Sequence, residues 1–295
     1  MTSSTSIPIL SGARDLLAAY DVVLCDVWGV IHNGREHFPA ACDALTRFRA
    51  QGGRVVLVTN APRPHAPIRL QLDGLKVPRD CFDDIVTSGD VTMNFIVAHG
   101  DKPVHHIGPE RDLALFEELA ALGHKPPLVS IEEAQYVICT GLNDDHNEVP
   151  EDYTARLKQM RARDLEFISA NPDLIVHVGD KLLYCSGALA ELYEKMGGKV
   201  IQAGKPYGPI YQRAYEIAQK LVGKPVDKAR VIGIGDAMRT DVKGACDFGV
   251  DALFVTSGIH RDELHPNNAL DEAALHQFIT DAPVTPRAAI PALAW

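Results

Sequence analysis

Short apolar runs rich in β-branched residues alternate with amphipathic segments along most of the chain. Helix-like patterns lie between several of these runs, such as PAACDALTRFRAQGG at 39–53, which ends on two glycines. Alternating helices and strands, with strands apolar on both faces, are typical of parallel βαβ units. The pattern therefore predicts an α/β fold with a doubly wound parallel sheet. Its expected strands are 21–25, 54–59, 199–203, 230–234 and 252–255.

The middle of the chain carries a second set of strand and helix patterns. We expect residues 87–184 to form an inserted α/β unit, and residues 1–86 and 185–295 to form the core domain. One continuous sheet of about ten strands is the alternative. The Pro- and Ala-rich tail after residue 281 is expected to be poorly ordered or to dock on the core. The elements expected in the insert are strands 104–107, 136–139, 166–169 and 182–185, and helices 91–98, 111–121 and 152–163.

Composition narrows the class of protein. The chain has 295 residues, 46% of them hydrophobic, and a net charge of -10, so it is expected to fold as a soluble protein that repels nucleic acids and anionic membranes. Its six cysteines form no C-x-x-C pair, which favours a reducing cytoplasm. No signal-peptide pattern or membrane-length apolar run is evident.

Polar residues with catalytic chemistry follow several of the predicted strands. In doubly wound folds, ligands bind at the carboxyl ends of the strands. Carboxylates, a hydroxyl and an ammonium together can hold Mg²⁺ and a phosphoryl group while one Asp attacks phosphorus. The residues are Asp26, Thr59, Asn60, Lys205, Asp236 and Asp241.

Each of these residues also has a structural interpretation when taken alone. Asp26 or Thr59 could cap a strand end, Asp241 could cap a helix, and Lys205 could be a solvated loop lysine. A dinucleotide fingerprint at GIGDAMRTD is excluded, because Met238 stands where that motif needs Gly. The ordered combination is far more specific than its parts.

Over nearly its whole length, the sequence resembles the haloacid dehalogenase (HAD) superfamily. Within that superfamily it is similar to the class IIA phosphatases of the NagD-like and p-nitrophenyl phosphatase-like kind. The resemblance implies a HAD-like core with an inserted cap, at 87–184, that selects the substrate. The motifs are D-V-W-G-V at 26–30, V-T-N at 58–60, N-P-D at 171–173, G-A-L at 187–189, G-K-P at 204–206 and G-D-A-M-R-T-D at 235–241.

Carried over position by position, the resemblance implies a catalytic role for three side chains. Asp26 would be the nucleophile that forms an aspartyl-phosphate, Thr59 would orient the phosphoryl group, and Lys205 would offset charge on both. The Asn60 amide, with backbone N–H groups after Asp26, would hold phosphoryl oxygens. Candidates for substrate binding are Arg63 near the core rim and Asn171 and Asp173 in the cap loop.

The same resemblance implies a Mg²⁺ site. Asp26, Asp236 and the backbone carbonyl of Trp28 would bind the ion, and Asp241 would complete the acidic site through outer contacts or water. Mg²⁺ prefers hard oxygen ligands and keeps several waters, so two carboxylates plus substrate suffice. This ion would be the partner that allows Asp26 to stand at the end of a buried strand.

Trp28 departs from the family pattern. Phosphatases of this superfamily usually have a second Asp there, which protonates the leaving group and then activates water. General acid–base catalysis contributes a factor of about 10²–10⁴ to the reaction rate, and without this Asp that contribution is in doubt. His32 is a candidate substitute acid, with His37 and Glu36 the other titratable residues nearby.

These observations lead to one functional prediction and leave alternatives open. We expect a Mg²⁺-dependent phosphatase acting on a small phosphorylated metabolite of the sugar phosphate or nucleotide class. Because Trp28 replaces the acid, the alternatives are hydrolysis of a bond other than a phosphate ester, and a weakly catalytic binding or regulatory protein. The resemblance also suggests a homodimer.

Overall fold

The computed structural model describes residues 7–178 and 181–295, which fold as two compact units. The first unit contains the chain up to Thr59, Gln71–Val86 and Tyr211–Trp295, and the second contains Asn60–Leu70 and Thr87–Ile210. The sequence analysis expected an insert at 87–184. The second unit contains the expected 87–184, but it also contains 185–210 and Asn60–Leu70, which were expected in the core.

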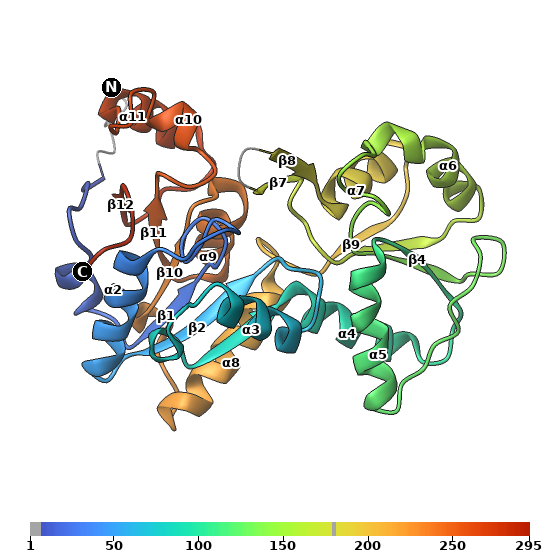
Figure 1. The fold of residues 1–295 in the computed structure, drawn as a ribbon, viewed down its shortest axis with the longest axis horizontal. Coiled ribbons are helices and arrows are strands. Elements are labelled where there is room, and N and C mark those ends of the chain that lie inside the picture. The colour runs from blue at the N-terminus through green and yellow to red at the C-terminus, as the bar shows by residue number, and fades with distance from the viewer. Residues whose placement is uncertain (1–6, 179–180) are drawn as a thin grey trace. The chain divides into compact units, whose positions relative to one another are not determined.

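The first unit is built on a six-stranded sheet in the order β12-β11-β10-β1-β2-β3 (Figure 1). The central strand β1 (Val22–Cys25) pairs in parallel with β2 (Arg54–Thr59) on one side and β10 (Val231–Gly235) on the other. Residues of β1 and β10 are buried throughout, because helices cover the sheet and apolar runs must fill both faces. The remaining strands are β3 (Asp84–Thr87), β11 (Asp251–Val255) and β12 (Ala288–Ile290).

The strand order places a topological switch point at the centre of this sheet. From β1 the chain adds β2 and β3 on one side, and later adds β10, β11 and β12 on the other. Ligands of doubly wound sheets bind outside the carboxyl ends of the strands at such a point. The helices of the first unit are α1 (Arg14–Leu17), α2 (Pro39–Ala50), α9 (Lys243–Phe248), α10 (Arg261–Leu264) and α11 (Glu272–Asp281), with short 3₁₀ turns at Arg79–Cys81 and Lys228–Arg230. Helices α3 (His65–Gly74) and α8 (Gly208–Val222) each have residues in both units.

The second unit has its own parallel sheet, in the order β4-β5-β6-β9. Successive residues of β5 (Tyr136–Cys139) face opposite sides: Tyr136 and Ile138 join one hydrophobic cluster, while Val137 and Cys139 join another. Helices α4 (Ser88–His99) and α5 (Ala114–Ala121) supply the first cluster, and α6 (Thr154–Ala162) and α7 (Ser186–Lys195) supply the second. The other strands are β4 (Val104–Ile107), β6 (Glu166–Ser169) and β9 (Val200–Gln202), and 3₁₀ turns precede α5 and α6 at Glu110–Leu113 and Pro150–Tyr153.

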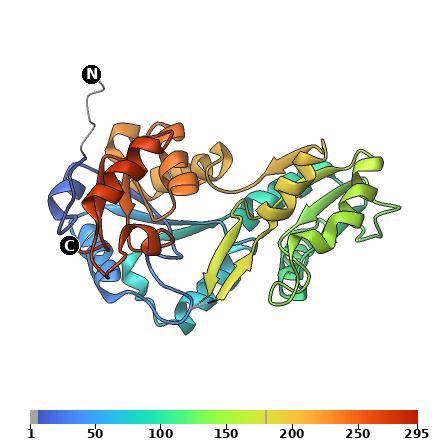
Figure 2. The same cartoon turned by 90° about the horizontal axis from the view of Figure 1, so that it is seen from above.

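An antiparallel pair of strands completes the second unit. Strands β7 (Ile175–Val178) and β8 (Lys181–Tyr184) form a separate two-stranded sheet, drawn as a yellow ribbon in Figure 2. The segment 182–185 was expected as one more strand of the insert's α/β unit. In β8 only Leu183 is buried, so this strand lacks the two covered faces of a parallel strand.

The doubly wound α/β fold is confirmed, and its division into separate sheets excludes the single continuous sheet. One local expectation needs correction. Strand β9, expected with the core, pairs with β6 in the second unit through Phe167↔Val200. Of the two alternatives for the tail after 281, the structure shows docking on the core: Leu253↔Ala288 begins a parallel pairing of β11 with β12, which becomes the edge strand of the first sheet.

Candidate active site

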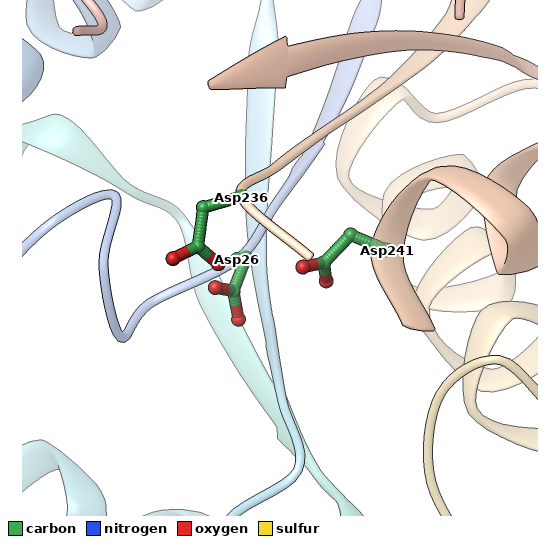
Figure 3. Close-up of side chains that lie close together, drawn as sticks. All are labelled: Asp26, Asp236 and Asp241. Carbon is green, nitrogen blue, oxygen red and sulfur yellow. The ribbon is translucent and has the colours of Figure 1, made fainter. Parts of the chain in front are cut away.

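Three buried carboxylates meet at the switch point of the first unit. Asp26 directly follows β1 and Asp236 directly follows β10, and these strands are parallel neighbours with Cys25 opposite Ile234. The Asp26 N–H continues the ladder by donating to the Ile234 carbonyl at 2.8 Å. Asp241 comes from the turn after Asp236 (Figure 3). One ligand oxygen from each carboxylate lies within 4.8 Å of the others, and the residues are only 5–7% exposed.

Backbone atoms of two glycines and of Ile259 lie close to the Asp236 carboxylate and fix its position. The Ile259 N–H donates to Asp236 Oδ2 at 2.7 Å. A Cβ atom placed on Gly29 would lie 2.0 Å from that oxygen, and one placed on Gly258 would lie 1.9 Å from it. Gly29 also has a φ of 84°, which side chains disfavour. The sequence analysis gave no role to these three residues, although Gly29 stands inside the D-V-W-G-V motif.

Asp241 is oriented by an unusual turn. Residues Met238–Val242 form one turn of π-helix, a widened coil frequent at functional sites. The Ala237 N–H donates to Asp241 Oδ2 at 3.0 Å, so the side chain bonds back to the start of its own turn. A Cβ on Gly235 would lie 2.2 Å from the Asp241 Cβ, so the close approach needs glycine.

The carboxylate cluster fits a divalent cation. Burying three like-charged groups within 4.8 Å of one another is costly unless a cation offsets their charge. All three donors are hard carboxylate oxygens, the ligand type preferred by Mg²⁺, Ca²⁺ and Mn²⁺. The donor chemistry therefore suits a divalent metal ion, in agreement with the sequence prediction of an ion at these residues.

Thr59 reaches the same edge of the sheet from the other side of β1. It is the last residue of β2, which runs parallel to β1 with Leu57 opposite Cys25. Its side chain is buried, and the residue is 7% exposed. The switch-point edge thus presents a hydroxyl in addition to the three carboxylates.

The loop after Asp26 holds Trp28 against its own backbone. The Gly29 N–H donates to the His32 carbonyl at 2.8 Å, and the Trp28 and His32 rings meet edge to face with 5.0 Å between their centroids. A Cβ on Gly34 would lie 2.5 Å from Trp28 Cη2, so the indole packs on a glycine. The indole is therefore fixed by packing within this loop.

His32 has the wrong protonation for a substitute acid. It is 2% exposed, and its Nδ1 accepts a hydrogen bond from the Gly34 N–H at 3.0 Å. Burial lowers the pKa of His32 to about 4. The imidazole is therefore neutral at pH 7 with its proton on Nε2, and a neutral imidazole is a poor proton donor. The burial of His32 and its lowered pKa therefore disfavour the sequence hypothesis that His32 replaces the missing acid.

The second unit brings together another group of the expected site residues. Asn60 Nδ2 donates to Asp173 Oδ1 at 3.0 Å, and Asn60 Oδ1 accepts from the Lys205 N–H at 2.7 Å. Asn171 Oδ1 accepts from the Asp173 N–H at 3.1 Å. Segments after β2, β6 and β9 therefore converge on these four residues.

Arg63 lies among other charged residues of the second unit. Its Nε is 3.9 Å from Asp112 Oδ1, and Arg111 Nε is 4.0 Å from the same oxygen. Burial raises the pKa of Asp112, while the two guanidinium groups oppose that rise. The buried Asp112 carboxylate thus partly offsets the charge of Arg63. The two residues lie far apart in the sequence, so their spacing did not predict this contact.

Family models match both parts of the sheet that carries the carboxylates. Residues 23–123 match the haloacid dehalogenase-like hydrolases, and residues 202–282 match a HAD-hydrolase-like family. A crystal structure of a haloacid dehalogenase-like family hydrolase from Brucella suis 1330 superposes with a TM-score of 0.85 and 45% identity, covering 96% of this chain and 99% of that one.

Two curated relatives are similar over most of their length. The ribonucleotide monophosphatase NagD of Escherichia coli (strain K12) is 27% identical over 241 residues, 80% of this chain and 88% of the relative. The acid sugar phosphatase of Staphylococcus haemolyticus (strain JCSC1435) is 26% identical over 243 residues, 81% of this chain and 86% of the relative. Within the described residues, no helix is both long and apolar enough to cross a membrane.

Proposed function

The chain belongs to the haloacid dehalogenase-like hydrolases, as a NagD-like phosphatase of class IIA, and on this premise we propose that it hydrolyses a sugar phosphate or nucleotide with Mg²⁺. The observation that carries the proposal is the cluster of Asp26, Asp236 and Asp241 at the switch point of the sheet. The relatives named for ribonucleotide and sugar phosphate hydrolysis support the substrate class.

In this proposal Asp26 acts as the nucleophile. One of its carboxylate oxygens forms a bond to phosphorus while the bond from phosphorus to the leaving oxygen breaks, which gives an aspartyl-phosphate and an alkoxide or phenoxide that then takes a proton from water. Water then attacks phosphorus, inorganic phosphate departs, and the Asp26 carboxylate is regenerated. Bound Mg²⁺ would supply positive charge to the phosphoryl oxygens.

Two further side chains would support the transferred group. The Thr59 hydroxyl donates a hydrogen bond to a phosphoryl oxygen, and the Lys205 ammonium offsets charge on the nucleophile and the phosphate. Asp236 and the Trp28 carbonyl would join Asp26 in holding the ion, and Asp241 would complete the acidic site. Because no acid stands at position 28, the leaving oxygen departs with little protonation.

We also propose that the second unit acts as a cap that excludes water and selects the substrate. Its separate sheet and separate hydrophobic clusters support an independent body. Asn171 and Asp173 are its candidate substrate ligands, together with Arg63. Substitutions in the 171–173 loop are then expected to change KM among substrates more than they change Mg²⁺ affinity.

The experiment is hydrolysis of p-nitrophenyl phosphate by the purified chain, with Mg²⁺ and with a chelator, followed by a screen of sugar phosphates and nucleotides. Asp26→Asn should abolish turnover, since an amide is neither a nucleophile nor a charged ligand, and Asp236→Asn should weaken metal activation most. Asp43→Asn is the matched control, because Asp43 is a half-exposed helix residue paired with Arg47.

Three results would contradict the proposal. Full activity in the chelator would contradict the metal, and full activity of Asp26→Asn would contradict the covalent step. Absence of turnover on every phosphate ester would favour the binding or regulatory alternative that Trp28 raises.

A further inference from the structure

The Asn60 side chain is occupied by hydrogen bonds within the second unit. Its Oδ1 accepts from the Lys205 N–H at 2.7 Å, and its Nδ2 donates to the Lys205 carbonyl at 3.2 Å and to Asp173 Oδ1 at 3.0 Å. An Asn amide has two donor hydrogens, and both are used here. Asn60 thus pairs with both backbone polar groups of Lys205, as a neighbouring strand would.

Tight packing surrounds these hydrogen bonds. Asn60 and Lys205 are each 4% exposed. A Cβ on Gly204 would lie 2.3 Å from Asn60 Oδ1 and 2.7 Å from Pro172 Cδ, so the chain before the lysine passes directly against both segments. Buried amide and carbonyl groups that lose such partners are strongly disfavoured. The backbone at Lys205 is therefore held in one place by Asn60.

The third partner, Asp173, belongs to a loop that is itself anchored. Ser186 Oγ donates to the Asn171 carbonyl at 2.9 Å and accepts from the Asn171 N–H at 3.0 Å. A Cβ on Gly187 would lie 2.4 Å from the Pro172 carbonyl oxygen, so helix α7 begins in contact with the loop. Asn60 consequently ties Lys205 to a fixed loop of the same unit.

We propose that Asn60 is a positioning residue for Lys205, and that Asn60 links the lysine to the 171–173 loop. This inference rests on the proposed function, in which the Lys205 ammonium offsets charge on the transferred phosphoryl group. It differs from the role that the family resemblance implied, in which the Asn60 amide itself binds phosphoryl oxygens. Both amide hydrogens are already engaged, so Asn60 acts on the phosphoryl group through Lys205.

The decisive experiment is a double-mutant cycle on the full chain with Asn60→Ala and Lys205→Met. The readouts are kcat for p-nitrophenyl phosphate and the affinity for inorganic phosphate in the presence of Mg²⁺. Misplacement of a catalytic group by about 1 Å costs about 10²-fold, so Asn60→Ala should lower kcat by about 10–100-fold with a smaller change in KM. In the Lys205→Met background, the same change should lower kcat and phosphate affinity by less than about threefold.

A direct phosphate ligand would behave differently. If Asn60 were such a ligand, Asn60→Ala would lower kcat and phosphate affinity by the same factor in the unmodified chain and in the Lys205→Met background. This result would overturn the inference. Unchanged kcat in Asn60→Ala would overturn it as well. If Lys205→Met alone leaves kcat and phosphate affinity unchanged, the proposed role of Lys205 is wrong. The inference depends on that role and would then be wrong as well. The matched control is Asn94→Ala on the exposed face of α4, which should change nothing.

A second pair of variants keeps the test valid if Asn60→Ala does not fold. Asn60→Asp keeps the shape and the acceptor for the Lys205 N–H, but it turns an oxygen toward the Lys205 carbonyl and Asp173. Adding Asp173→Asn restores a donor between positions 60 and 173. The double variant should recover part of the kcat lost in Asn60→Asp, whereas a lack of recovery at equal thermal stability would contradict the link to the loop.

Discussion

Replacing Gly258 with Ala is expected to weaken metal activation without removing any ligand. The new Cβ would lie 1.9 Å from Asp236 Oδ2, 2.3 Å from its Cβ and 2.5 Å from its Cγ. Ordinary non-bonded contacts are about 3.5 Å or longer, so the two residues must separate by about 1–1.5 Å. The Ile259 N–H that bonds Asp236 Oδ2 at 2.7 Å belongs to the next residue and would be displaced together with Gly258.

The size of the effect follows from what holds the carboxylate. Groups that orient a metal ligand are typically worth a factor of about 10–100 in metal affinity. We therefore expect the Mg²⁺ concentration for half-maximal activity to rise about 10–100-fold in Gly258→Ala, or about 1.4–2.7 kcal/mol. Saturating Mg²⁺ should restore part of kcat, because Asp236 itself remains.

The assay is a Mg²⁺ titration of p-nitrophenyl phosphate hydrolysis, with thermal unfolding measured in parallel. Gly74→Ala is the control, because nothing lies within 4 Å of a Cβ placed on Gly74. It makes the same chemical change in the first unit and should leave the titration unchanged. An activation constant for Gly258→Ala equal to that of the unmodified chain would refute the steric argument.

Three further outcomes are expected. Because Trp28 supplies no acid, aryl phosphates should react much faster than alkyl phosphates when chemistry limits turnover, and Trp28→Asp should narrow that gap by about 10-fold or more; equal rates in the unmodified chain would mean that another acid is present. Burial lowers the pKa of His106 from 6.5 to about 4 in the folded chain. As the pH drops below about 6.5, the unfolded chain therefore binds a proton at His106 that the folded chain does not bind, and the free energy of unfolding falls until the pH nears 4. Between pH 7 and pH 5 this should cost about 1 kcal/mol after allowance for partial exposure, measured by urea unfolding, and an unaltered pH slope in His106→Gln would contradict it. Asp83→Ala should lower the free energy of unfolding by about 2–4 kcal/mol, since Asp83 accepts two hydrogen bonds from Arg49, at 2.9 and 2.6 Å, and one from the Val55 N–H at 2.8 Å; a urea midpoint within error of the unmodified chain would contradict that.

Four strands of the first unit's sheet, β1, β2, β10 and β11, were predictable because buried parallel strands need continuous apolar runs, whereas β3 and the edge strand β12 were not among the expected strands. The same logic located Asp26 and Asp236, since residues that directly follow such strands must share one edge of the sheet. Strand β9 escaped this reasoning. Its three residues are all only partly buried, and nothing in so short a run says which sheet it joins, because pairing depends on the partner strand.

Parts of the site depend on contacts that residue types do not reveal. Gly29 and Gly258 matter because Asp236 occupies the space where their side chains would be, and that fact exists only in three dimensions. Asn60 had the right chemistry for a phosphate ligand, but its hydrogens are taken by Lys205 and Asp173. The sequence was enough to predict which residues belong to the candidate site. Their hydrogen-bond partners could be identified only from the folded structure.

The π-helical turn at Met238–Val242 holds one residue more than an α-helical turn in the same place would. Deleting one residue between Asp236 and Asp241 would remove that extra residue, and an α-helical turn could then lead into α9 with the register of the helix unchanged. Every acidic residue would be retained, and only the width of the turn that orients Asp241 would change. This turn is therefore the place where the chain around the site can be shortened by one residue without loss of a carboxylate.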